Sequence, residues 1–341
     1  MHIEKSDTKP SKKQINQKVS KRKTAKNRLA SKQLLVEKSL EKKLPLTEKL
    51  NLHPRNKHRA RYDFEALMQA NPSLTDFVAP NAYGDASIYF ANPQAVIALN
   101  KALLAHHYGI RDWDVPAQYL CPPIPSRADY IHYLADLLAP TQKAIRALDL
   151  GVGANVVYPL IGNREYSWEF VGADTDSVAI ENAEKIVKTN DLSKAIELRL
   201  QANPANFFKG VIKTGEYFDI TLCNPPFHAS TDEAAAASQR KQSGLRGHKV
   251  SDKPALNFGG QAHELIYAGG EEAFVCSMVR ESKAFAKQVG WFSSLISKEA
   301  SLPAVYQALR DVGASEVLTI PMAQGQKKSR FVAWTFNKQT T

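Results

Sequence analysis

The sequence predicts an α/β fold built on a mostly parallel, doubly wound sheet of seven strands. From about residue 144 onward, short apolar runs alternate with helical patterns, which is typical of a parallel sheet with helices on both faces. Residues from about 51 to 140 show helical patterns interrupted by Pro and Gly. A third observation is that the excess positive charge lies in the first 50 residues. We therefore expect a basic arm (1–50), a mostly helical region (51–140) and a sheet domain (141–341).

The apolar runs and helical patterns define the expected elements. The strands are expected at Ala144–Leu150, Phe170–Ala173, Ile196–Leu200, Phe218–Cys223, Gly290–Ser297, Glu316–Ile320 and Phe331–Phe336. The helices are expected at Ala60–Ala70, Pro93–His107, Ser177–Thr189, Glu271–Gln288 and Leu302–Val312. Too few residues separate the last two strands to hold a helix, so we expect a hairpin that adds one antiparallel edge strand.

The basic arm concentrates nearly all of the net charge. Its 50 residues hold 15 of the 45 Lys and Arg residues but only five of the 34 Asp and Glu residues. The arm thus carries +10 of the total net charge of +11 and contains no aromatic residue. Such a segment cannot bury a core, so we expect it to be largely disordered and drawn to the phosphates of a polyanion. A solvated tail that keeps the protein soluble is the alternative.

Composition excludes several other classes of protein. No apolar run approaches the roughly 18 residues that a membrane span requires, and the basic N-terminus lacks the apolar segment of a secretory signal. The three cysteines, Cys121, Cys223 and Cys276, are far apart and form no CxxC pair. Their spacing argues against a disulfide framework and against a structural zinc site. We expect a cytoplasmic protein that binds neither membrane nor metal.

A glycine-bearing turn, Asp149-Leu150-Gly151-Val152-Gly153-Ala154-Asn155, follows the first expected strand. Glycine allows the backbone to turn sharply and to approach a ligand closely. Asp174 ends the second strand, where a carboxylate can accept hydrogen bonds from both hydroxyls of a ribose. Together they predict a site for a nucleoside cofactor, although an ordinary tight turn is the alternative. The third glycine of a dinucleotide fingerprint is missing, which favours S-adenosylmethionine over NAD.

The segment Asn224-Pro225-Pro226-Phe227 follows the fourth expected strand. Consecutive prolines lock the chain into an extended conformation, so that the amide oxygen of Asn224 and the carbonyl of Pro225 can converge on one point. Two converging acceptors suit an amine with two N–H donors, and Phe227 offers a ring for base stacking. Catalysis of this kind depends on positioning and on acceptor electrostatics rather than on a strong base. A polar turn after a strand is the alternative.

These motifs resemble those of the amino-methyltransferases that act on adenine N6, cytosine N4 or protein glutamine. From about residue 50 to the end, the chain is similar to the ribosomal RNA large subunit methyltransferase F family, which methylates adenine N6 in 23S rRNA. Eukaryotic relatives of that family methylate U6 and messenger RNA hairpins. The resemblance is carried by Leu52–Asn56 with Arg59 and Tyr62–Phe64, by Pro123–His132, by Asp149–Asn155 with Tyr158–Leu160, by Asn224–Phe227, and by Asn257–Gly260 with Glu264 and Gly269–Glu271.

The resemblance implies a class I, S-adenosylmethionine-dependent methyltransferase with a Rossmann-like sheet. The implied cofactor-binding residues are Arg127 at the methionine carboxylate, Asp149, Gly151, Gly153 and Asn155 around the methionine portion, Asp174 at the ribose, and Asn203 near the adenine. Asn224, Pro225, Pro226 and Phe227 would hold the target base. A simple pair between Arg127 and Asp129 is the alternative for that arginine.

The resemblance also implies an RNA partner, either 23S rRNA or a large-subunit assembly intermediate. His53, Arg55, Asn56 and Arg59 would lie along the RNA, where guanidinium groups can grip phosphates. The alternative for this cluster is a solvated helix start. The polar segment containing Gly244–Lys249 is expected to order on substrate. We expect a monomer, and two other functions stay open: adenine methylation of another structured RNA, and a ribosome assembly factor that uses the fold as a scaffold.

Overall fold

The computed structural model describes residue 49 and residues 51–117, 119–138, 144–230, 233, 262–324 and 327–337. These residues belong to one structural unit, Lys49–Thr341. Apart from Lys49, the expected basic arm lies outside the described residues. So do the segments Gly244–Lys249 and Asn257–Gly260 that the sequence singled out.

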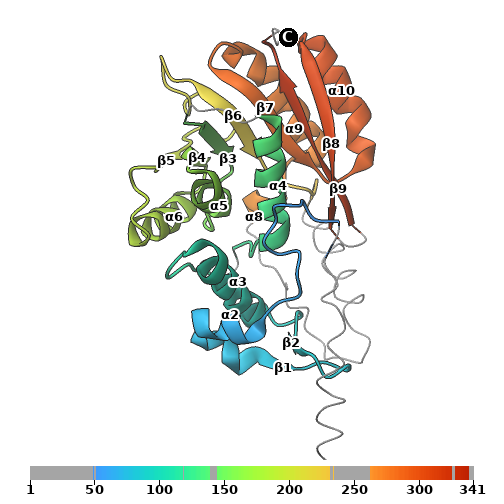
Figure 1. The fold of residues 1–341 in the computed structure, drawn as a ribbon. Coiled ribbons are helices and arrows are strands. Elements are labelled where there is room, and N and C mark those ends of the chain that lie inside the picture. The colour runs from blue at the N-terminus through green and yellow to red at the C-terminus, as the bar shows by residue number, and fades with distance from the viewer. Residues whose placement is uncertain are drawn as a thin grey trace, which may run out of the picture. The chain divides into compact units, whose positions relative to one another are not determined.

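A seven-stranded sheet forms the centre of this unit, with the strand order β5-β4-β3-β6-β7-β9-β8 (Figure 1). Its strands are β3 (Arg146–Leu150), β4 (Glu169–Asp174), β5 (Ile196–Leu200), β6 (Phe218–Cys223), β7 (Val289–Ile296), β8 (Glu316–Gln324) and β9 (Lys327–Thr335). Strands β5, β4, β3, β6 and β7 pair in parallel. The predicted doubly wound sheet is therefore confirmed, and β5 and β6 have the predicted bounds.

The C-terminal hairpin differs from the prediction in one respect. Strand β9 lies between β7 and β8 and is antiparallel to both. The strand that runs against the rest of the sheet is therefore internal, and β8 forms the edge. The burial pattern explains this order. In β9, Phe331 and Ala333 face one hydrophobic cluster while Val332 and Trp334 face the other, and all four are fully buried. A strand that is apolar on both faces is covered best in the interior of a sheet.

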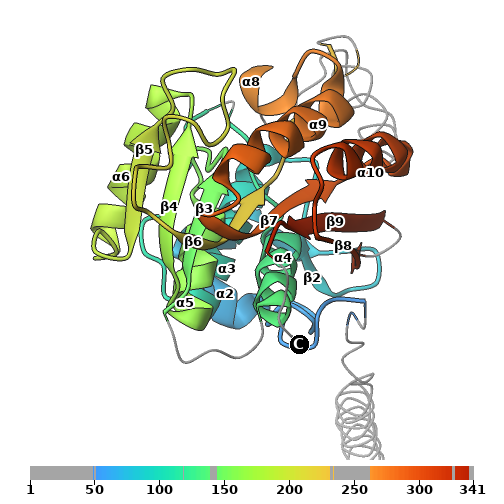
Figure 2. The same cartoon turned by 90° about the horizontal axis from the view of Figure 1, so that it is seen from above.

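Helices cover both faces of the sheet (Figure 2). The helices are α2 (Phe64–Ala70), α3 (Pro93–Tyr108), α4 (Ile124–Leu137), α5 (Val157–Tyr166), α6 (Ser177–Thr189), α8 (Ala262–Leu265), α9 (Gly270–Ser282) and α10 (Leu302–Asp311). Short 3₁₀ turns lie at Pro72–Phe77, Lys283–Phe285 and Glu299–Ser301. Apolar side chains of α4, α5 and α6 join one cluster, whereas those of α9 and α10 join the other.

Helix α5 was not among the predicted helices, because Pro159 and Gly162 interrupt its pattern. Pro159 lies in the first turn, where a helical N–H has no intrahelical partner and its absence costs nothing. Gly162 faces the sheet, where an added Cβ would come within 2.5 Å of the Phe170 ring. Glycine thus allows α5 to pack closely on β4.

The region before the sheet is less helical than expected. A hairpin of β1 (Val78–Pro80) and β2 (Ala86–Ile88) lies where Pro80 and Gly84 suggested only a break between short helices. The side chain of Asn81 accepts hydrogen bonds from the backbone N–H groups of Tyr83 and Asp85 and so shapes the hairpin turn. The predicted helix over Ala60–Ala70 begins only at Phe64, because Asp63 caps it through the N–H of Ala66.

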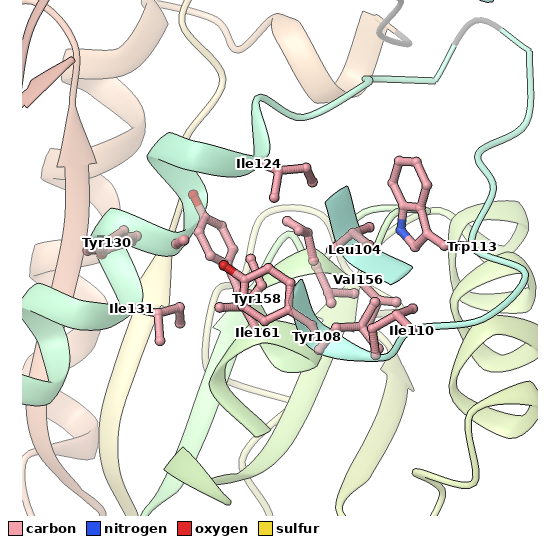
Figure 3. Packing of buried hydrophobic residues seen from close by; sticks show 14 of the residues in the cluster. Leu104, Tyr108, Ile110, Trp113, Ile124, Tyr130, Ile131, Val156, Tyr158 and Ile161 are labelled. Atoms are coloured by element: carbon pink, nitrogen blue, oxygen red, sulfur yellow. The ribbon is translucent and has the colours of Figure 1, made fainter. Parts of the chain in front are cut away.

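The helices of this region pack against the sheet domain through large apolar side chains. Figure 3 shows Leu104 and Tyr108 of α3, Ile131 of α4 and Ile161 of α5 among the side chains of the buried cluster. All belong to one buried cluster. Helices α3 and α4 therefore form part of the layer that covers one face of the sheet.

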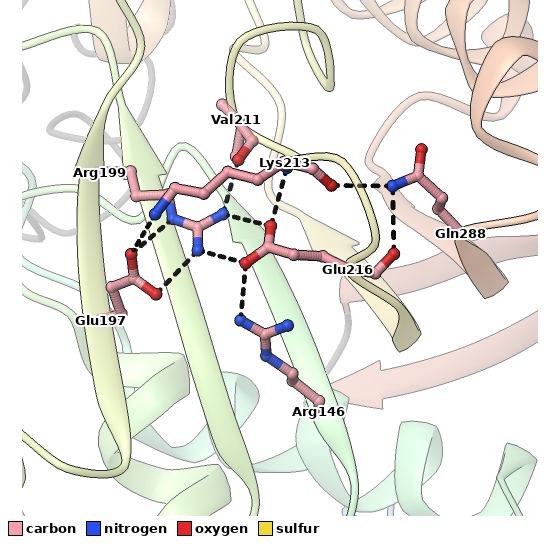
Figure 4. A network of polar contacts seen from close by, with 7 residues as sticks. All are labelled: Arg146, Glu197, Arg199, Val211, Lys213, Glu216 and Gln288. Carbon is pink, nitrogen blue, oxygen red and sulfur yellow. Dashed lines mark hydrogen bonds and ion pairs between the residues drawn. The ribbon is translucent and has the colours of Figure 1, made fainter.

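A charged network ties β5 to β3 and to the loop before β6 (Figure 4). The buried guanidinium of Arg199 lies 2.8 Å from Glu197 and 2.7 Å from Glu216, and Arg146 lies 3.0 Å from Glu216. Hydrogen bonds from Arg199 are the main reason why the pKa of Glu216 and that of Glu197 each fall to about 2. Both carboxylates thus stay ionised far below ordinary pH.

No helix in the described part of the chain has the length and apolarity that crossing a bilayer requires.

Candidate cofactor and substrate-base site

A cavity opens at the carboxyl ends of β3, β4 and β6, the edge at which open α/β sheets bind ligands. Its lining includes seven of the predicted site residues, Arg127, Gly151, Gly153, Asn155, Asp174, Asn224 and Pro226. Residues from four distant parts of the sequence therefore meet at one place. The parallel register explains part of this meeting, because Leu150 pairs with both Ala173 and Cys223, the residues before Asp174 and Asn224.

The glycine turn after β3 lies directly against β4. The N–H groups of Gly151 and Val152 both donate to the carbonyl of Ala173, at 2.9 and 3.0 Å. Gly151 and Gly153 have φ values of +73° and +64°, a conformation that residues with a Cβ rarely adopt. An added Cβ at Gly151 would meet no protein atom within 4 Å, so it would project into open space at the cavity. The turn therefore offers a ligand close access to the backbone.

Asp174 is held by the backbone of two loops. One carboxylate oxygen accepts from the N–H of Gly153 at 2.9 Å, and the other accepts from the N–H of Asp176 at 3.1 Å. These bonds fix the plane of the carboxylate at the cavity wall. Each carboxylate oxygen can accept more than one hydrogen bond. The geometry is suited to a ligand with a pair of hydroxyl groups.

Asp149 lies beneath the glycine turn and is fully buried. Neither of its carboxylate oxygens has a hydrogen-bond partner among the residues that the structure describes. Burial, reinforced by the neighbouring charge of Asp174, raises the pKa of Asp149 well above its usual range, and Arg127 opposes that shift. A buried carboxyl of this kind is costly unless a ligand or ion satisfies it.

Arg127 projects from the first turn of α4 and is nearly buried. Its Nη1 donates to the hydroxyl of Tyr158 at 2.8 Å and to the amide oxygen of Asn224 at 3.0 Å. Asp129, the alternative partner, instead accepts hydrogen bonds from the backbone of His53 and the side chain of Asn56. Arg127 therefore connects the cofactor side of the cavity with the Asn-Pro-Pro-Phe loop.

The Asn-Pro-Pro-Phe loop begins where β6 ends. Pro225 and Pro226 are buried, whereas Asn224 and Phe227 are half-buried. Phe227 does not line the cavity, and its ring makes no contact with another aromatic ring of the described residues. The next residue is fixed, because the backbone of His228 exchanges hydrogen bonds with Leu265 and Tyr267 at 2.9 and 3.0 Å. The loop is thus anchored at both ends.

The cavity lining includes several residues that the sequence analysis did not predict, and it lacks one that it did predict. The cavity is also lined by Leu120, Pro122, Tyr158, Gln201, Asn206, Phe207 and Glu264. Asn203 is not in the lining, and its side-chain oxygen accepts from the N–H of Ala205 at 3.0 Å. Phe207 comes four residues later, and its aromatic character was the available signal. Glu264 holds the opposite wall by accepting from the N–H of Leu120 at 3.1 Å.

The four predicted RNA-binding residues lie away from the cavity and divide into two pairs. His53 and Asn56 are buried, and both hold α4: His53 Nε2 lies 2.8 Å from Asp136, and Asn56 donates to the Pro125 carbonyl at 2.9 Å. Arg55 is exposed and donates to Asp136, whereas the Arg59 side chain donates to the Pro54 carbonyl. Of the four, Arg55 is exposed and Arg59 is half-buried. Nearby, His132 stacks on His53 and bonds to Tyr166, as expected of a packing histidine.

The residues present fit S-adenosylmethionine. The glycine turn offers open space beside its backbone, Asp174 presents acceptors for ribose hydroxyls, and Phe207 and Gln201 line the wall after β5. The orphaned carboxyl of Asp149 can accept a hydrogen bond from an ammonium group, and the guanidinium of Arg127 complements a carboxylate. Among the described residues, no group of three His, Cys, Asp or Glu side chains is arranged to hold a metal ion.

Comparison with known proteins gives a consistent family. The sequence pattern of the family described as RNA methyltransferase matches residues 46–338. The chain is 56% identical over 303 residues to the ribosomal RNA large subunit methyltransferase F of Yersinia pestis (strain Pestoides F), covering 86% of this chain and 90% of that protein. It is 54% identical over 311 residues to the enzyme of the same name from Marinomonas sp. (strain MWYL1), covering 89% and 95%.

Solved structures agree with the sequence relatives. The catalytic domain of hMettl16 in complex with MAT2A 3′UTR hairpin 1 matches with a TM-score of 0.73 and 29% identity, over 85% of this chain and 97% of that one. The N-terminal domain of human METTL16 in complex with S-adenosylhomocysteine (SAH) matches with a TM-score of 0.68 and 27% identity, over 84% and 99%. The likeness confirms the class I methyltransferase fold and S-adenosylmethionine as the cofactor. The chain belongs to the RNA methyltransferase family.

Proposed function

We propose that the protein transfers a methyl group from S-adenosylmethionine to the N6 amine of a specific adenine in 23S ribosomal RNA. The observation that carries the proposal is the position of Asn224 and Pro226 in the wall of the cofactor cavity, at the end of β6. The names of the sequence relatives support ribosomal RNA as the substrate. Phe227 and the arginines outside the cavity favour a nucleic-acid base over a protein side chain.

Eight residues would hold the cofactor. Asp174 would accept the ribose hydroxyls, Gly151, Gly153 and Asn155 would surround the methionine portion, and Arg127 and Asp149 would bind its carboxylate and ammonium. When bound, S-adenosylmethionine supplies an electrophilic methyl group on a sulfonium that leaves as a neutral thioether. Asn203 has its side chain committed within its own loop, so we assign the adenine wall to Phe207 and Gln201.

The Asn-Pro-Pro-Phe loop would orient the target amine. The amide oxygen of Asn224 and the carbonyl of Pro225 would accept its two N–H bonds, which directs the nitrogen lone pair toward the methyl group. The same oxygens stabilise the positive charge that develops on nitrogen. Cys223 and Tyr158 do not serve as bases, because burial raises the pKa of each thiol or hydroxyl above its usual range. The proton therefore leaves to water.

RNA would lie along the outward arginines of the 51–140 region. Arg55 and Arg59 can grip phosphates, whereas His53 and Asn56 would act indirectly by holding α4. The arm over 1–50 would add electrostatic attraction without base recognition. We propose that the protein acts as a monomer.

The test is methyl transfer from labelled S-adenosylmethionine to RNA from a strain that lacks this protein, followed by nucleoside mass spectrometry. We expect N6-methyladenosine in 23S rRNA. With Asn224→Ala we expect kcat to fall by about 10²–10³, as when one oriented polar partner of a transition state is removed, while SAH binding is retained. Label in another RNA would point to a different structured substrate. Retention of the cellular role by the inactive variant would favour the scaffold function.

A further inference from the structure

One hydrogen bond joins the two halves of the site and conflicts with the proposed chemistry. Nη1 of Arg127 donates to the amide oxygen of Asn224 at 3.0 Å. In the proposed reaction, this oxygen must accept an N–H bond of the target adenine with its one remaining lone pair, in the space beside the guanidinium. The guanidinium also brings a positive charge next to the place where the amine nitrogen becomes positive.

We propose that Arg127 blocks Asn224 until the carboxylate of the cofactor engages the guanidinium, so that the target adenine enters only after the cofactor. The inference rests on the proposed function of the Asn-Pro-Pro-Phe loop. It assigns Arg127 a second role as a positioning residue that couples the two binding events.

Relative hydrogen-bond strengths favour this order. A guanidinium is an ionised donor, and its bonds to a neutral oxygen are stronger than those of a neutral amine. An adenine N–H is therefore a poor competitor for Asn224 while Arg127 is present. A carboxylate is a stronger acceptor than an amide oxygen, and it can bind guanidinium through two parallel bonds. The cofactor can thus draw Arg127 away, whereas the base alone cannot.

The surroundings allow such a movement and supply no substitute for the cofactor. Tyr158 accepts from the same Nη1 at 2.8 Å, and its ring lies 5.5 Å from the guanidinium carbon, so it can hold Arg127 as a pivot in either position. The carboxyl of Asp149 nearby has a raised pKa and is a weak source of neutralising charge. A cofactor carboxylate would provide that charge and lower the cost of a cationic nitrogen beside it.

The test compares ligands with and without the carboxylate. SAH carries the amino-acid portion, whereas 5′-methylthioadenosine shares the nucleoside and thioether but lacks it. Binding is measured by fluorescence anisotropy on a 23S rRNA fragment that contains the adenine methylated in the assay above. The matched control RNA carries purine riboside at that position, which removes only the amine.

We expect SAH to tighten binding of the adenine RNA by at least about fivefold, in the range typical of coupled sites. We expect 5′-methylthioadenosine to change it less than about twofold, and neither ligand to change binding of the purine riboside RNA. Because coupling is reciprocal, the adenine RNA should tighten SAH binding by the same factor in calorimetry. In Arg127→Met, SAH should bind more weakly and its effect on RNA binding should disappear.

Equal enhancement by SAH and 5′-methylthioadenosine, or enhancement that survives in Arg127→Met, would overturn the inference. The comparison of the two ligands uses the unaltered protein and does not depend on the folding of a variant. If the wild type methylates 23S rRNA but shows no ligand difference, only the role of Arg127 fails. If no adenine is methylated, the proposed function fails first.

Discussion

The sheet domain and the region before it use opposite kinds of polar chemistry to stay folded. In the sheet domain, Arg199 is buried between Glu197 and Glu216, and all three groups are charged. In the region before the sheet, buried imidazole and amide side chains hold the elements together. There, His58 bonds to Tyr108 at 2.9 Å, and burial lowers the pKa of His58 to about 2, so its ring stays neutral.

The difference follows from what each network must hold. The charged network joins strands and a loop within a sheet that hydrogen bonds already define. The neutral network, in which the uncharged side chains of Asn56 and His58 bond to Pro125, Asp129 and Tyr108, attaches the irregular segment 51–59 to α3 and to the first turns of α4, the helix that carries Arg127. Neutral partners can be buried there without a large desolvation cost. We infer that the first network mainly contributes stability, whereas the second mainly positions the cofactor site.

The largest effect is expected in the charged network. Arg199→Met leaves Glu197 and Glu216 facing each other without their shared cation, and breaking a buried ion pair from one side costs about 3 kcal/mol or more. The free energy of unfolding, measured in urea at pH 7, should fall by about that amount, while SAH affinity stays near the wild-type value at temperatures where the variant is folded. Arg111→Met is the matched control, because the Arg111–Asp191 pair is exposed and its loss should cost less than about 1 kcal/mol. Equal losses for the two variants would show that the network contributes little.

A smaller loss of stability with a larger loss of cofactor affinity is expected in the neutral network. Asn56→Ala removes the donor to the Pro125 carbonyl and to Asp129, two groups that flank Arg127 in the sequence. Stability should fall by about 1–2 kcal/mol, the usual cost of a lost buried hydrogen bond. Calorimetry should also show weaker SAH binding, because the first turn of α4 is less firmly held. Arg55→Ala is the control from the same segment and should leave SAH affinity unchanged, since Arg55 contacts the far end of α4. Unchanged SAH affinity in Asn56→Ala would contradict a positioning role.

The same contrast explains how much of the molecule was predictable. In the sheet domain, alternating apolar residues and short connections express the fold locally, so β5, β6 and α6 have the predicted bounds. The order of the last two strands could not be predicted from the local sequence, because it depends on which strand can be covered on both faces. The hairpin at Pro80 and Gly84 was missed for a related reason. Its turn is set by the side chain of Asn81, and Pro and Gly alone do not distinguish it from a break between helices.

The site residues were predictable where one short sequence motif both contains them and fixes their position. The backbone of the glycine turn and the end of β4 place Asp174, so sequence spacing was sufficient. The segment around His53 and Asn56 was harder, because polar residue types alone do not reveal whether a side chain faces solvent or a buried carboxyl. The contact between Arg127 and Asn224 joins residues 97 positions apart, and no local pattern encodes it.

The smallest change at a single step of pH, and the sharpest separation of the two regions, should appear in acid. The pKa of His58 is lower in the folded protein than its unfolded value of 6.5. Below pH 6.5 the unfolded chain therefore binds a proton at His58 that the folded chain does not bind. Stability from this group is present above pH 6.5 and falls as the pH drops below it, by at most about 1.4 kcal/mol per pH unit. His132 acts in the same direction, with a folded pKa of about 4.

The carboxylates of the sheet domain act in a lower window. Glu216 and Glu197 have folded pKa values of about 2, below the ordinary 4.5, so their contribution is present above pH 4.5 and is lost as the pH falls toward 2. Urea unfolding at pH 7, 5 and 3.5 should therefore show a first loss from the imidazoles and a second from the carboxylates. His58→Gln, which keeps a polar partner for Tyr108, should reduce the loss between pH 7 and 5 by about 1 kcal/mol or more. His106→Gln, an exposed change on α3, the helix that carries Tyr108, should not alter it. If both variants kept the full wild-type loss, the neutral network would not be the source of acid sensitivity above pH 5.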